Sequence, residues 1–190
     1  MINLLTDDLP RTVSVDHNSY MIYTDFRDYI ELQQMIMDGV DDYVIVNYIC
    51  GLYMNEKPSD LKKCIHAINT FMKGNVDGSK DDSHDSSFNG KKASRFAFSY
   101  KYDAPYIIGA FLECYGIDLM TCEYMHWWKF NALFDSLNEN TELKKRIAYR
   151  MMDISKIKNK DEKKRIRRIQ KQIAIPVVNV MSDEDIANAF

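Results

Sequence analysis

Apolar positions follow a period of two near the start of the chain and a helical period over most of the rest. β-branched and aromatic residues at 12–15 and 20–23 flank a polar segment at 16–19. Two such runs around a polar turn predict a β-hairpin. A single short hairpin is not stable alone, so we expect it to pack on helices.

Helical spacing of apolar residues, together with capping residues and glycine stops, predicts the remaining elements. The suitable N-caps are Thr24 or Asp25, Asp41 or Asp42, Asp103, Thr121 and Thr141, and the suitable stops are Gly39, Gly74 and Gly116. The helix beginning near residue 41 is apolar on almost every side, which predicts a central position in the fold. The expected helices are 24–38, 41–53, 58–74, 103–116, 121–137, 141–151 and 159–173.

Residues 74–92 interrupt this pattern, because they are rich in Asp, Ser, Asn and Gly and contain only two apolar side chains, Val76 and Phe88. Such a composition predicts a mobile loop. The remaining pattern predicts a mainly α protein, a compact helical domain of about six to seven helices with a small N-terminal β-hairpin. We expect residues 1–190 to form one domain.

Composition adds a charge asymmetry. The hydrophobic content of 46% and the charged content of 28% are ordinary for a globular protein, and the net charge is -3. Residues 156–172, however, contain nine Lys or Arg and two acids, whereas the rest of the chain contains 16 bases and 26 acids. The basic helix predicted at 159–173 could therefore contact an acidic partner, nucleic acid or the acidic body of the protein itself.

The four cysteines lie in apolar segments and form no C-x-x-C pair, so we interpret them as reduced core residues. The N-terminus lacks the features of a signal peptide. No uninterrupted apolar stretch approaches the roughly 20 residues that cross a bilayer. We expect a protein that stays in the cytoplasm of the cell that makes it, without membrane contact.

The sequence contains none of the common phosphate-binding, nucleophile-elbow or zinc-protease motifs. The acidic residues at 77–85 do not match the spacing of a calcium-binding loop. Cys114, Cys122 and His126 could share a zinc ion, but a structural site needs a fourth ligand and none is evident. We therefore predict no enzyme activity, no cofactor and no metal.

Three parts of the chain carry a family resemblance. Residues 115–119 read Y-G-I-D-L and residues 126–130 read H-W-W-K-F, within a longer similar segment at 103–137. Residues 3–10 and 23–27, and the basic helix after Tyr149-Arg150, are similar as well. Together they resemble the bacteriophage gene-product-fifteen family, from the tail-morphogenesis region of long-tailed phages and prophages.

The resemblance implies a tail-assembly protein, encoded near the tape-measure gene, that acts in the cytoplasm of the infected bacterial host. Its position suggests a chaperone that coats the tape-measure protein until tail-tube subunits polymerise, and that is absent from the mature virion. Self-association, a structural role in the virion and a nucleic-acid-associated or regulatory role through the basic helix remain alternatives. Nucleic acid is disfavoured because residues 156–172 contain no aromatic residue for stacking.

Two groups of residues are the candidates for partner binding. Neighbouring helix positions lie about 100° apart, so we expect one of the two adjacent tryptophans to be buried and the other to lie at an interface. The candidate aromatic residues are Trp127, Trp128, Phe130 and Phe134. The candidate basic residues are Arg165, Arg167 and Arg168.

Overall fold

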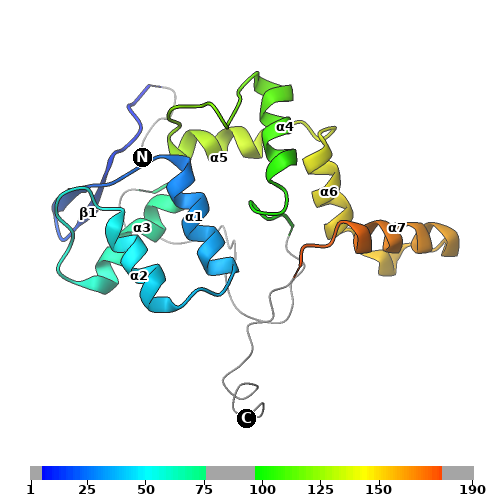
Figure 1. Cartoon of the computed structure of the whole chain (residues 1–190), viewed down its shortest axis with the longest axis horizontal. Helices are drawn as coiled ribbons and strands as arrows, with labels where there is room; N and C mark the ends of the chain where they lie inside the picture. Colours follow the sequence, from blue (N-terminus) through cyan, green and yellow to red (C-terminus); the bar gives the residue numbers. More distant parts are fainter. Residues whose placement is uncertain (1–5, 76–96, 177–190) are drawn as a thin grey trace, which may run out of the picture.

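The computed structural model describes residues 6–75 and 97–176, and these residues form a mainly α fold with an N-terminal β-hairpin (Figure 1). The predicted fold class is therefore confirmed. The elements are β1 (Thr12–Val15), β2 (Asn18–Met21), α1 (Phe26–Met37), α2 (Asp42–Gly51), α3 (Leu61–Met72), α4 (Ala104–Tyr115), α5 (Trp127–Asp135), α6 (Glu142–Met151), the 3₁₀ turn η1 (Ile154–Lys156) and α7 (Lys160–Gln172).

The hairpin is tighter than its sequence predicts. Val15 pairs with Asn18, so only Asp16 and His17 form the turn. Both have positive φ, 51° and 66°, as a two-residue turn needs if its twist is to match the twist of the strands. The chain after β2 then pairs with the segment following α2, where Tyr23 donates to the Leu52 carbonyl and Met54 donates to the Met21 carbonyl. These bonds attach the hairpin to the helices.

Most helix starts agree with the predicted caps. The Asp25 and Asp41 carboxylates and the Thr141 hydroxyl each accept a backbone N–H of the helix that follows, which satisfies donors that a helix leaves free. The helix predicted from Pro58 begins later, because Asp60 is its cap. The basic helix begins after Asn159, as predicted.

The helix predicted from Thr121 begins six residues later, at Trp127. Residues 121–126 are instead tied to the start of α1. Phe26 N–H donates to the Met125 carbonyl, and Trp127 N–H donates to the Thr24 carbonyl. These bonds join positions about one hundred residues apart, so no local pattern predicts them.

The core is centred on α5 and not on α2, which corrects the prediction of a central helix at 41–53. Phe130 of α5 is fully buried and stacks against Phe26 of α1 and Phe111 of α4, with ring centroids 4.7 and 5.2 Å apart. By contrast, Ile49 is the only buried residue of α2, and the Tyr43 side chain is 75% exposed. Several apolar residues of α2 therefore remain exposed to solvent in this fold.

The basic helix α7 extends away from the helices that surround the core (Figure 1). It follows α6 and η1 and lies at the opposite end of the molecule from the hairpin and α2. The loop predicted at 74–92 falls almost entirely outside the described residues.

Candidate partner-binding surfaces

The four aromatic candidates all belong to the core. Trp127 and Trp128 are only 2% and 6% exposed, and Phe130 and Phe134 are buried as well. The expectation that one tryptophan is buried while the other lies at a surface is therefore wrong. No part of this aromatic group is available to a partner in the folded chain.

Both tryptophans are buried because α5 lies between two other helices. The Trp127 ring stacks on Tyr29 of α1, and the Trp128 ring stacks on Phe71 of α3. The Trp127 Nε1–H donates to the Met72 carbonyl at 3.1 Å, and the Trp128 Nε1–H donates to the Phe71 carbonyl at 2.7 Å. The two indoles thereby donate to carbonyls in the last turn of α3, where the regular helical hydrogen bonds end. The Phe71 carbonyl also accepts the Gly74 N–H.

His126 has a structural role at the start of α5. Its Nδ1 accepts the Trp128 N–H at 3.1 Å, so its Nε2 carries the hydrogen that is donated to the Pro10 carbonyl at 2.9 Å. Burial lowers the pKa of this imidazole from its ordinary value of 6.5, and the charge of Arg11 lowers it further. Among the described residues, no cluster of His, Cys, Asp and Glu is arranged to hold a metal ion.

The exposed apolar residues beside the hairpin form a patch that the sequence interpretation missed. Met21, Tyr23 and Met54 are each exposed to between 44% and 48%. The antiparallel pairing of Ile22 with Tyr53 places Met54 opposite Met21, and alternation puts Met21 and Tyr23 on one side of the strand. We call these three residues the hairpin patch. Strand alternation around the buried Ile22 is the sequence pattern that could have identified it.

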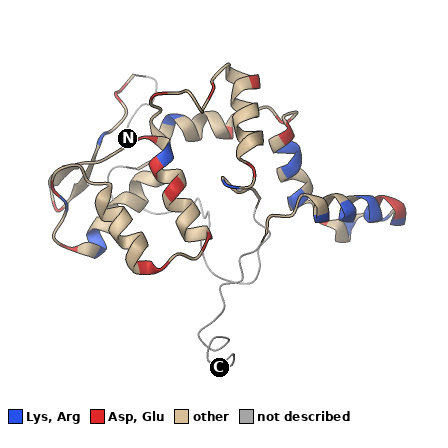
Figure 2. Cartoon of the chain, in the orientation of Figure 1, with Lys and Arg blue, Asp and Glu red and all other residues tan. Residues whose placement is uncertain are grey.

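The three basic candidates do lie at the surface. Arg165, Arg167 and Arg168 are all exposed on α7, the helix in which Lys and Arg are concentrated in Figure 2. Arg165 forms a hydrogen-bonded pair with Glu162, one helical turn away, through bonds of 2.8 and 3.0 Å. This bond lowers the pKa of the Glu162 carboxyl. Arg167 and Arg168 have no ion-pair partner among the described residues.

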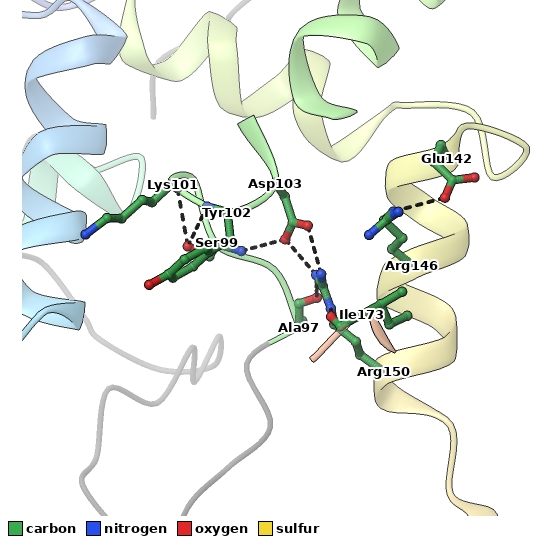
Figure 3. A network of polar contacts seen from close by, with 9 residues as sticks. All are labelled: Ala97, Ser99, Lys101, Tyr102, Asp103, Glu142, Arg146, Arg150 and Ile173. Carbon is green, nitrogen blue, oxygen red and sulfur yellow. Dashed lines mark hydrogen bonds and ion pairs between the residues drawn. The ribbon is translucent and has the colours of Figure 1, made fainter. Parts of the chain in front are cut away.

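A buried ion pair holds the C-terminal end of α7 in place. The Arg150 guanidinium donates to both carboxylate oxygens of Asp103, at 2.6 and 2.8 Å (Figure 3). It also donates to the carbonyls of Ala97 and Ile173, at 3.2 and 2.7 Å. The Ile173 bond holds the residue that ends α7, so the beginning of α4, the end of α6 and the end of α7 meet at one guanidinium.

The segment that contains α1 and the start of α2 is acidic. Residues 25–42 contain six acids and one Arg, and the acidic residues of α1 and of the turn before α2 lie far from the basic residues of α7 (Figure 2). Two of the acids are paired, since Asp25 contacts Arg27 and Asp38 contacts Lys101. We call the other four the acidic face, and within the described residues none of them has an ion-pair partner: Asp28, Glu31, Asp41 and Asp42.

No helix in the described part of the chain combines the length and the apolar character needed to cross a membrane. The comparison with curated proteins gives no match, and neither does the comparison with solved structures. The family model described as "Bacteriophage Gp15 protein" matches residues 5–175. Because this match covers nearly the whole chain, including the hairpin, α5 and the basic helix, the protein belongs to the bacteriophage Gp15 protein family.

Proposed function

We propose that this phage protein is a non-catalytic tail-assembly chaperone that binds the tape-measure protein in the cytoplasm of the infected host. The observation that supports the proposal is the hairpin patch, an exposed apolar surface on a protein whose aromatic helix is fully used by its own core. A chaperone of this kind must cover apolar surface of its partner and later release it.

The chemistry of the hairpin patch suits a helical partner. A tape-measure protein is long and helical, and an apolar stripe on such a helix can lie against an exposed apolar surface. The thioethers of Met21 and Met54 adapt to differently shaped side chains. The Tyr23 ring adds apolar area and a hydroxyl that can remain in water. Side chains that are half exposed bury limited area, which favours the reversible binding that assembly requires.

The hairpin patch can be tested by co-expressing the protein with the tape-measure protein of its own phage and measuring capture in a pull-down. We expect Met21→Ser combined with Met54→Ser to reduce the captured amount by about tenfold, because two apolar contacts are lost. The matched control is Leu112→Ser combined with Met120→Ser, which removes exposed apolar residues from α4 and from the segment that follows it. Equal capture by both variants and the unchanged protein would exclude the hairpin patch as the binding surface.

Nucleic-acid binding is the second candidate, and the projecting basic helix is the observation that favours it. Its prediction is a DNA affinity that falls steeply with salt and is abolished by Arg165→Glu, Arg167→Glu and Arg168→Glu together. Residues 160–172 contain no aromatic side chain to stack on bases, so we rank this function below chaperoning. A third candidate, a structural virion component, predicts that the protein persists in purified particles.

A further inference from the structure

We infer that the basic face of α7 docks on the acidic face of a second copy of this chain, so that the protein associates head to tail. The inference concerns the protein alone and does not depend on the proposed tape-measure partner. It rests on the placement, length and charge of two surfaces that lie at opposite ends of one molecule.

The face of α7 that would dock is a continuous basic stripe. Lys160, Lys164, Arg167 and Lys171 are all exposed, and their spacings of four, three and four residues place them along one side of a helix. The stripe extends over about 16 Å at a rise of about 1.5 Å per residue. Within the residues that the structure describes, none of these four side chains has an ion-pair partner.

The acidic face is opposite in charge to this stripe and similar in length. Asp28 and Glu31 lie one turn apart on α1, and Asp41 and Asp42 lie four and five residues beyond its last residue, Met37. Asp28 is about 14 Å from the end of α1 along the helix axis. Burial raises the pKa of Asp28, the negative charge of Asp25 adds to this rise, and the positive charge of Arg27 partly offsets it.

Contact within one chain cannot join the two surfaces. Figure 2 places the basic helix and the acidic residues of α1 and α2 at opposite ends of the molecule. Each copy therefore offers one basic and one acidic end, and the two ends are different patches. Such a heterologous contact leaves a free end on each partner and produces rings or open chains.

The acidic end also offers apolar contacts that its own fold leaves uncovered. Tyr43, next to Asp42, is 75% exposed, and Val44 is exposed as well. The Tyr43 ring gives the Arg167 guanidinium of a second copy a surface for cation–π stacking. A nucleic acid would find a less suitable site on this protein, because the net charge of -3 repels it and α7 has no aromatic residue.

The test uses the purified full chain and measures mass by sedimentation velocity over a range of protein and salt concentrations. We expect association at low salt that is lost at high salt, since the screening length falls from about 10 Å at 0.1 M to 3 Å at 1 M. Two reversal variants separate the surfaces. One carries Lys164→Glu with Arg167→Glu, and the other carries Glu31→Lys with Asp42→Lys.

Each variant alone should associate at least about tenfold more weakly than the unchanged protein, a difference of about 1.4 kcal/mol. An equimolar mixture of the two should associate again, because every junction in the mixture joins opposite charges. The controls change net charge equally at other exposed sites, with Lys62→Glu and Lys129→Glu for one and Glu123→Lys and Glu139→Lys for the other. If Asp42→Lys weakens the first turn of α2, Glu31→Lys alone replaces that variant.

Four results would overturn the inference. The unchanged protein could remain monomeric at low salt, or the reversal variants could associate as strongly as it does. The controls could weaken association as much as the reversals, which would indicate a general effect of net charge. Finally, the mixture could fail to associate. Tape-measure binding is absent from all these measurements, so their failure would leave the proposed function untouched.

Discussion

Arg150 and Asp103 form a bidentate ion pair that is almost completely removed from solvent, with the two side chains 6% and 1% exposed. The Asp103 carboxylate also accepts the Ser99 N–H. Donors within the protein therefore take the place of water around this carboxylate. This pair joins the start of α4 to the end of α6 and, through the Ile173 carbonyl, to the end of α7.

We predict that Arg150→Ala destabilises the protein by about 3–5 kcal/mol, because it leaves a buried carboxylate without its partner. Urea denaturation measures this loss. Arg165→Ala is the control, since Arg165 and its partner Glu162 on α7 are both largely exposed, and it should cost at most about 1 kcal/mol. A variant that carries both Arg150→Ala and Asp103→Ala should lose less stability than the sum of the losses of the two single variants. Additive losses would contradict a direct interaction.

The buried tryptophans lead to a second prediction. Trp127→Ala and Trp128→Ala should each cost about 3–5 kcal/mol of unfolding free energy. Trp128→Phe should cost about 1–3 kcal/mol, because it keeps most of the ring volume but removes the indole N–H that donates to the Phe71 carbonyl. Tyr43→Ala is the control and should change stability by less than about 0.5 kcal/mol. If replacing either tryptophan by alanine lowered the unfolding free energy only slightly, that tryptophan would be exposed and would again be a candidate for partner binding.

The sequence predicted features that depend on neighbouring residues. Asp25, Asp41 and Thr141 cap helices where their positions indicate, because a cap bonds an N–H two or three residues along the chain. The start of α5 was mispredicted because it depends on the bond from Trp127 to Thr24 across the fold. Similarly, the adjacent tryptophans could not be assigned without knowing that α1 and α3 cover both sides of α5.

The apolar character of α2 shows a second limit of sequence interpretation. Tyr43 and Val44 make the helix apolar on most sides, which is typical of a buried helix. Sequence alone cannot distinguish apolar residues that the chain covers itself from those that remain exposed. The exposed apolar residues of α2 and the hairpin patch are therefore not evident from the sequence, and the prediction that the aromatic residues of α5 form a contact surface is wrong.

The buried imidazole of His126 predicts a pH dependence of stability. Because burial lowers its pKa in the folded state, the unfolded chain takes up a proton first as the pH falls below 6.5, and stability falls with it. A proton on Nδ1 would also abolish the bond from the Trp128 N–H. We expect denaturation midpoints measured from about pH 7.5 to about pH 5.5 to decline in the unchanged protein.

His126→Asn should flatten this decline, because an asparagine oxygen can still cap α5 but cannot titrate. The variant loses the bond to Pro10 and should be less stable at neutral pH. His66→Asn, at an exposed position on α3, is the control and should leave the slope unchanged. If both variants keep the slope of the unchanged protein, His126 is not the titrating group.

The attachment of α7 gives the final prediction. Ile166 is 2% exposed but lies outside the main hydrophobic core, and Gln170 bonds the carbonyls of Tyr149 and Met152. Ile166→Ala should therefore weaken a local attachment by about 2 kcal/mol or more. Hydrogen exchange of residues 160–172 should accelerate while exchange in α4 and α5 stays slow. Arg168→Ala, exposed on the same helix, should change neither rate. Equal acceleration in all three helices after Ile166→Ala would mean that α7 unfolds only together with the core.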